Sequence, residues 1–157
     1  SLANDQLRFN DTARATVVNN TVSSFPYLEN FESGTSGGGF AQGTFPNGWS
    51  VTTNNSGFPF SWYLFSGSTG SFATGPTVDH TFGTASGKYV YTEASNGIQG
   101  DTTILTSPCF NLTSLTNPTL EFWFHRVGAT IGDMVIEYDD NGTWTLLDTF
   151  LYMNVLL

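Results

Sequence analysis

The hydrophobic residues of this chain fall into short runs, separated by turns rich in Gly, Asn and Ser. In residues 120–125, Leu and Phe alternate with Glu, Trp and His, as they do in a strand whose successive side chains point to opposite faces. No stretch keeps a 3.6-residue period, so we expect almost no helix and an all-β, antiparallel domain. Strands are predicted at residues 49–53, 62–65, 88–93, 102–106, 119–126, 134–138 and 143–150.

The last two predicted strands are joined by Asp139-Asp140-Asn141-Gly142. This run superficially resembles a Ca²⁺-binding loop, but it lacks the alternating ligand spacing and the distal glutamate of an EF-hand. Because Asn and Gly tolerate positive φ, we interpret the run as a hairpin turn.

Composition narrows the class of protein. The 157 residues suffice for one domain, and 14 Phe with 17 Gly suit many short strands. Thirteen acidic against four basic residues give a net charge of −9, which disfavours nucleic acid and anionic membranes and favours cations. The single cysteine, Cys109, excludes a disulfide within the chain, and no apolar run reaches transmembrane length.

Four motifs follow one another in a fixed order. Together they resemble the MAM domain, the extracellular β-sandwich module named for meprin and receptor tyrosine phosphatase mu. The opening residues 25–32 resemble those of MAM-containing proteins secreted by Bacteroidetes-type bacteria. The motifs are Gly75-Pro76-Thr77-Val78-Asp79-His80-Thr81, Gly87-Lys88-Tyr89-Val90-Tyr91-Thr92-Glu93-Ala94-Ser95, Leu105-Thr106-Ser107-Pro108 and Leu120-Glu121-Phe122-Trp123-Phe124-His125-Arg126 through Gly132.

The resemblance implies an antiparallel jelly-roll β-sandwich over residues 25–157. Residues 1–24 are polar and are interpreted as an extended leader or as the end of a preceding module. The family's closing strands have no counterpart before the apolar tail at residues 155–157, so we expect a sandwich that is incomplete at its C-terminus. Unpaired edges of that kind invite a strand from another module or chain.

The resemblance also implies a structural Ca²⁺ near the opening strand. Glu32 and Asp79 are the predicted metal ligands, with Glu93 and Asp101 in reserve, because a hard cation takes carboxylate oxygens. The alternative is that Glu32 and Asp79 accept hydrogen bonds from loop amides.

Aromatic residues offer a second kind of site. Trp62 and Tyr63 stand beside Gly- and Pro-rich loops and are the predicted exposed pair for stacking on sugar rings. Trp49 and Trp123 lie in motif segments, where we expect them to pack in the core.

Catalysis is not expected. No nucleophile elbow or zinc-binding helix is present. Asp79 and His80 are neighbours and would point apart on a strand. By resemblance, His80 and His125 are structural residues packed beside aromatic side chains.

The chain is therefore predicted to be a non-catalytic, extracellular or cell-surface interaction and adhesion module of a larger protein. Its expected partners are other protein modules or chains. The alternative is a carbohydrate-binding accessory module of a secreted hydrolase, with glycans as ligands. Nucleic acid and direct membrane insertion are not expected.

Overall fold

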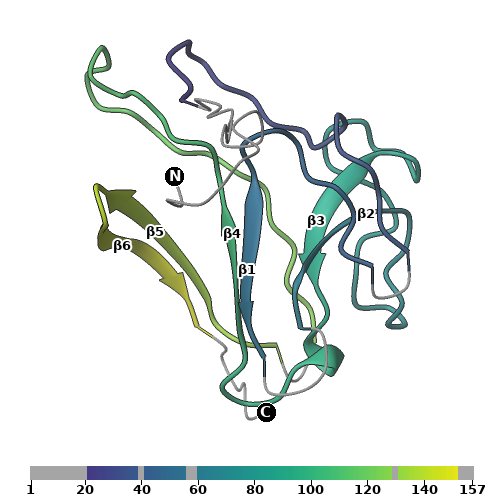
Figure 1. Ribbon diagram of the computed structural model, residues 1–157. Coiled ribbons are helices and arrows are strands. Elements are labelled where there is room, and N and C mark those ends of the chain that lie inside the picture. The colour runs from purple at the N-terminus through teal and green to yellow at the C-terminus, as the bar shows by residue number, and fades with distance from the viewer. Residues whose placement is uncertain (1–20, 39–40, 56–59, 129–130, 152–157) are drawn as a thin grey trace, which may run out of the picture.

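A computed structural model describes residues 21–38, 41–55, 60–128 and 131–151. These residues form three antiparallel strand pairs (Figure 1). The pairs are β1 (Ser50–Asn54) with β4 (Thr102–Thr106), β2 (Trp62–Ser66) with β3 (Lys88–Thr92), and β5 (Met134–Asp140) with β6 (Thr143–Phe150). Helix is limited to one short 3₁₀ turn, η2 (Ala94–Asn96), in the described part of the chain. The all-β, antiparallel prediction is confirmed, and the arrangement is consistent with a jelly-roll sandwich.

Six of the seven predicted strands match observed strands within two residues at either end. The seventh is wrong, because residues 119–126 belong to no strand. In Figure 1 this part of the chain runs down the molecule between β1 and β3 in the view shown. The alternation of apolar residues is real, yet no neighbouring strand pairs with it among the described residues. We call residues 119–128 the unpaired stretch.

The β2–β3 pair carries the densest packing. Tyr63 faces Tyr91 across the ladder, and Phe65 faces Tyr89, with ring centroids 5.5 Å and 6.3 Å apart. Aromatic pairs directly opposite on adjacent strands stabilise a sheet by tenths of a kcal/mol to about 1 kcal/mol each. The period-two pattern of these strands thus gathers four aromatic rings on one face.

Leu64 lies on the opposite face of β2 and is fully buried, at 0% exposure. Its amide donates to Gln42 O and its carbonyl accepts from Gly37 N, both at 2.9 Å, so the Gly/Ser loop lies along the second edge of β2. Gly34 permits this approach, because a Cβ there would overlap the Leu64 side chain and the Thr44 carbonyl. The loop's glycines are therefore needed for close backbone packing.

The opening segment packs beside β1 and the end of β4. Trp49 Nε1 donates to Tyr27 Oη at 3.1 Å, and Tyr27 donates to Glu29 Oε2 at 3.0 Å. The Tyr27 ring meets Phe110 edge-on, with centroids 5.2 Å apart. Burial, reinforced by the Glu29 carboxylate, raises the pKa of Tyr27. Trp49 was expected in the core and is half-buried in this cluster.

The predicted leader lies outside the described residues up to residue 20, and so does the tail at 155–157. A search of the described residues found no helix with the length and apolar character needed to cross a bilayer.

Candidate interaction surface

One face of the unpaired stretch packs on the β5–β6 hairpin. Phe122 and Phe124 meet the ring of Phe150, the last residue of β6, at centroid distances of 6.5 Å and 4.7 Å. From the same face, Arg126 donates Nη1 to Phe150 O at 2.8 Å and Nη2 to Gly132 O at 2.6 Å. Because Gly132 precedes β5 and Phe150 ends β6, one guanidinium joins both ends of the hairpin to the stretch.

The other face of the stretch contacts the loop that leads into β3. Trp123 stacks on His80 with ring centroids 4.1 Å apart and an interplanar angle of 18°. His125 Nε2 lies 3.0 Å from the carbonyl oxygen of Thr74. Both histidines thus have packing or hydrogen-bond partners, in agreement with the structural role expected for them.

Trp123 departs from the prediction. It was expected in the core, but 67% of it is exposed. Its stacking partner covers one side of the indole only, and in the described structure no strand covers the rest.

The backbone of the unpaired stretch is open on both edges in the described structure. No ladder includes residues 119–128, and none of the backbone hydrogen bonds outside the ladders involves them. Side chains on its two faces hold the stretch in place. Its backbone N–H and C=O groups, which point sideways along the two edges, pair with no other backbone group of the described residues. Such groups are obligatory hydrogen-bonding groups and form strand edges.

The hairpin beside it exposes apolar residues on its outer face. The register pairs Asp139 with Trp144 and Glu137 with Leu146, on the face opposite to Phe150. Trp144 and Leu146 are 53% and 58% exposed. The predicted hairpin turn is confirmed, since Asn141 (φ 52°) and Gly142 (φ 89°) connect the strands with positive φ at both positions.

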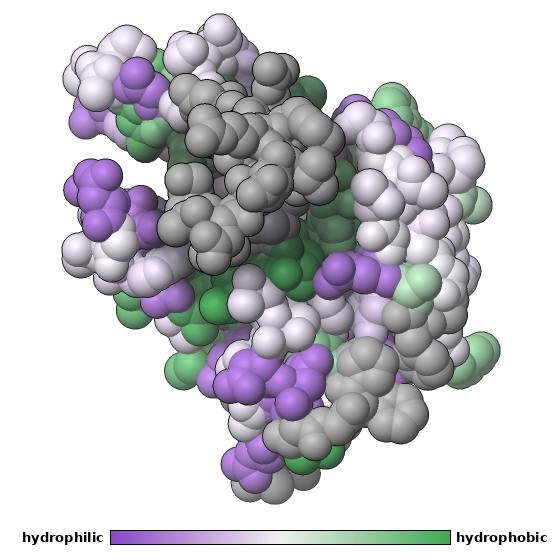
Figure 2. Space-filling model, viewed as in Figure 1, coloured by the Kyte–Doolittle hydropathy of each residue, from purple (hydrophilic) through white to green (hydrophobic). Residues whose placement is uncertain are grey.

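Large apolar residues are therefore exposed together over the unpaired stretch and the hairpin. Figure 2 shows apolar surface in the middle of the molecule and along the hairpin side. Large exposed apolar residues in groups are typical of protein–protein contact sites. We call this set the interaction surface: Leu120, Phe122, Trp123, Phe124, Val127, Val135, Tyr138, Trp144, Leu146, Leu147 and Leu151.

The charge around the interaction surface is strongly negative. Residues 119–150 contain six carboxylates (Glu121, Asp133, Glu137, Asp139, Asp140 and Asp148) and one cationic side chain, Arg126. The Arg126 guanidinium is directed at two backbone carbonyls. The surface therefore presents an acidic rim to an incoming partner.

The predicted metal ligand Glu32 lies against the start of β3. Glu32 Oε1 accepts from Lys88 N at 2.7 Å, and Glu32 Oε2 lies 3.5 Å from Lys88 Nζ. Nζ also donates to the Glu32 backbone carbonyl at 2.8 Å. An amide proton and an ammonium thus occupy the positions that a cation would take at this carboxylate.

The second predicted ligand, Asp79, closes the loop just before β3. Only 4% of this residue is exposed. Its Oδ2 accepts from Phe82 N at 2.7 Å and its Oδ1 from Thr84 N at 3.1 Å. These hydrogen bonds, chiefly that from Phe82, lower the pKa of Asp79. With its carboxylate turned to these amides, Asp79 does not orient the ring of His80.

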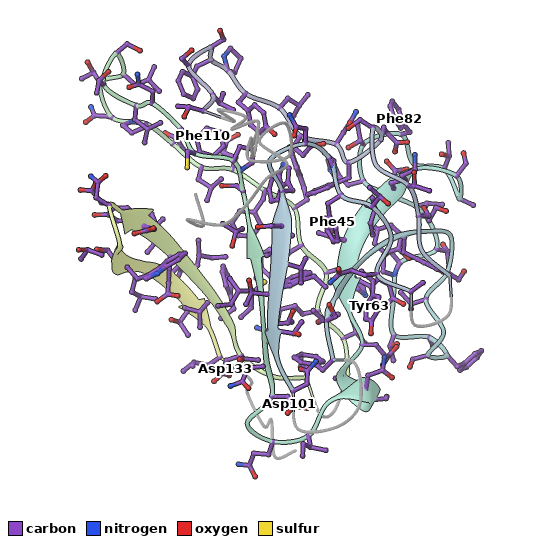
Figure 3. The ribbon with its side chains drawn as sticks, viewed as in Figure 1. Phe45, Tyr63, Phe82, Asp101, Phe110 and Asp133 are labelled. Carbon is purple, nitrogen blue, oxygen red and sulfur yellow. The ribbon has the colours of Figure 1, made fainter. Side chains whose placement is uncertain are left out.

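Glu32 and Asp79 contact neighbouring residues at the start of β3. The Asp79 carboxylate lies against Gly87, and Glu32 accepts from the amide of Lys88. The reserve ligand Asp101 is remote from them: Figure 3 shows it at the opposite end of the molecule from Phe82, which belongs to the Asp79 loop. No group of three or more His, Cys, Asp or Glu fit to hold a metal occurs within the described ranges. In this arrangement amides and an ammonium engage the two carboxylates, and we derive no role for the ion.

The predicted sugar-stacking pair is not exposed as a pair. Tyr63 is 2% exposed and packs against Tyr91, inside the β2–β3 part of the molecule (Figure 3). Trp62 is half-buried. The exposure expected for Tyr63 is therefore wrong, because the period of β2 turns its ring into the aromatic face of the sheet.

The sequence did not predict that the unpaired stretch and the hairpin expose apolar residues. Their alternation predicts strands, and a strand in a sandwich is assumed to bury one face. The only available signal was the number of acidic residues among the aromatic ones between positions 119 and 150. Acidic residues in these positions disfavour burial of either strand on both faces.

Comparisons with known proteins identify a family and a distant relative. The family described as "MAM domain, meprin/A5/mu" matches residues 30–151. Among curated proteins, the chain is 35% identical over 78 residues to "Neuropilin-1a" of Danio rerio. That alignment covers 50% of this chain and 8% of the relative. No solved structure matches.

Proposed function

Because this chain belongs to the MAM domain family, we propose that it is a non-catalytic interaction and adhesion module of a larger secreted or cell-surface protein. It binds another protein through the interaction surface formed by the unpaired stretch and the β5–β6 hairpin. The sequence relationship to a neuropilin over half of the chain supports an extracellular setting for this module.

The observation that carries the proposal is the joint exposure of Trp123 and Trp144, at 67% and 53%. Tryptophan is enriched among the residues that dominate binding energy at protein interfaces, because a large rigid ring is buried there at little cost in side-chain entropy. Trp123 lies on the face of the stretch that meets the His80 loop, and Trp144 lies on the hairpin face opposite to Phe150, so each ring offers a separate anchor. Acidic residues around them supply the polar rim of a specific interface.

The test is a binding screen of the full chain, multimerised on streptavidin, against an array of purified extracellular domains. We expect at least one partner whose binding falls at least about tenfold with Trp144→Ala or Trp123→Ala. Ile98→Ala is the matched control, since Ile98 is 65% exposed beyond η2 and outside the interaction surface. Partners that lose binding equally with all three variants, or with Ile98→Ala alone, would place the contact elsewhere.

A structural Ca²⁺ remains a prediction from the family resemblance. It requires Lys88 to leave the Glu32 carboxylate, so binding must compete with two hydrogen bonds and an ion pair. Thermal unfolding with Ca²⁺ and with a chelator tests it in the wild type and in Glu32→Gln. A stabilisation by Ca²⁺ that Glu32→Gln abolishes would support the ion, and identical unfolding curves would remove it.

A further inference from the structure

The unpaired stretch has the geometry of a strand that lacks its neighbours. Its side chains alternate between two layers: Phe124 contacts Phe150 of the hairpin, while Trp123 stacks on His80 of the facing loop. Both layers hold it in place, and Arg126 fixes its end. The stretch is therefore ordered by its faces and open at its edges among the described residues.

An open edge between the hairpin and the facing loop is suited to strand addition. An added strand satisfies the backbone groups of the stretch, and its own alternate side chains enter the two layers. The exposed residues at the edge, Leu120 (64%) and Trp123 (67%), would lose solvent contact at the same time. Hydrogen bonding and apolar burial thus favour the same occupant, an extended polypeptide.

Charge selects the chemistry of that polypeptide. Glu121 lies on the stretch itself, on the same face as Trp123, and forms no ion pair with a cation of the described residues. The cations of the described residues are engaged: Lys88 with Glu32, and Arg126 with two backbone carbonyls. A second copy of this chain would bring the same acidic rim against itself, which like-charge repulsion disfavours.

We infer that the edge of residues 120–126 accepts one extended segment of a partner protein in which apolar residues alternate with lysine or arginine. This inference rests on the proposed function and gives its partner a chemical class. Seven residues of the stretch span about 23 Å as a strand, so a partner segment of similar length suffices.

The experiment uses the full chain and synthetic peptides of about nine residues. The parent peptide alternates Val and Lys, one control has the same residues with Val and Lys in separate blocks, and another carries Glu in place of Lys. We expect the alternating basic peptide to bind at least about tenfold more tightly than both controls, measured by fluorescence anisotropy. Two further peptides carry backbone N-methyl groups, one on its Val residues and the other on its Lys residues. Since strand pairing uses one edge of the peptide, only one of the two should lose binding.

Hydrogen exchange and two charge variants locate the bound peptide. Amides of residues 120–126 should gain protection when the parent peptide binds. Glu121→Gln should weaken binding and reduce its salt dependence. Glu93→Gln makes the same charge change at a residue that accepts a hydrogen bond from Ser71. It should leave the affinity and its salt dependence unchanged.

Three outcomes overturn the inference. They are equal binding of the blocked peptide, no gain of protection in residues 120–126, and a dimer in sedimentation that excludes the peptide. The last outcome makes a second copy the occupant. If Trp144→Ala still abolishes binding to an array partner while residues 120–126 gain no protection, the proposed function stands and strand addition fails.

Discussion

Lys88 holds Glu32 at both its side chain and its backbone. The Lys88 amide donates to Glu32 Oε1 at 2.7 Å, and the ammonium donates to the Glu32 carbonyl at 2.8 Å. The two residues are 56 positions apart in the sequence, so these contacts join the opening segment to the first residue of β3. A double contact of this kind fixes where the opening segment meets the β2–β3 pair.

Removing the Glu32 carboxylate should destabilise the fold. Glu32→Ala leaves the Lys88 amide without its acceptor, so we expect the free energy of unfolding to fall by about 1–3 kcal/mol in urea denaturation. Glu32→Gln keeps an oxygen acceptor and loses only the partly exposed ion pair, so its loss should be smaller. Equal losses in the two variants would mean that charge, rather than the amide hydrogen bond, matters.

Gly87 should tolerate no side chain. A Cβ at this position would overlap the Asp79 carboxylate, which two amides hold in place. We expect Gly87→Ala to lower the free energy of unfolding by about 1–3 kcal/mol, the usual cost of overpacking. Gly70→Ala is the control, because nothing lies within 4 Å of its added Cβ. A stable Gly87→Ala protein would show that the loop from Asp79 to Gly87 rearranges freely.

Acid should weaken the same loop. The amides of Phe82 and Thr84 hold the pKa of Asp79 below its ordinary value of 3.8. A carboxyl whose pKa is lower in the folded state stabilises the fold fully above the ordinary pKa and loses that contribution as pH falls through the folded value. We expect the stability advantage of the wild type over Asp79→Asn to shrink below about pH 4. Denaturant unfolding of both proteins from neutral pH downward measures it, and a constant difference would contradict the assignment.

High pH should destabilise the fold through ionisation of Tyr89. Burial raises the pKa of Tyr89 from 10.0 to about 12, and its hydroxyl donates to Gly67 O. Because the folded pKa is the higher one, the contribution to stability is complete below pH 10 and is lost as pH rises toward 12. A spectrophotometric titration should show a late-titrating tyrosine that Tyr89→Phe removes. An unchanged late phase in that variant would assign it to another tyrosine.

Local patterns predicted most of the fold. The short aromatic runs in Trp62–Ser66 and Lys88–Thr92 predicted strands, because aromatic and β-branched residues favour strands. The same holds for the turn at Asn141-Gly142, where positive φ is a local preference. The motif order likewise pointed to the family that now matches residues 30–151.

Sites were predicted less well, because exposure and partners are not local properties. The pattern placed Tyr63 and Trp62 side by side in the sequence, but a strand sends neighbours to opposite faces, and Tyr63 became buried. For Glu32 and Asp79, the sequence left open whether a metal or amides meet the carboxylates. The nearest donors, Lys88 and the Phe82 amide, are defined only when the loops close.

By itself, the sequence determined the antiparallel β class, the positions of six strands, the MAM family and the acidic character. Strand patterns, motif order and charge can all be identified from the sequence without knowing which segments are in contact. The tertiary structure alone decided that residues 119–128 pack through both faces and pair through neither edge, and that Trp123 is exposed. Strand pairing depends on which segments lie side by side, and that is settled by contacts between residues far apart in the chain.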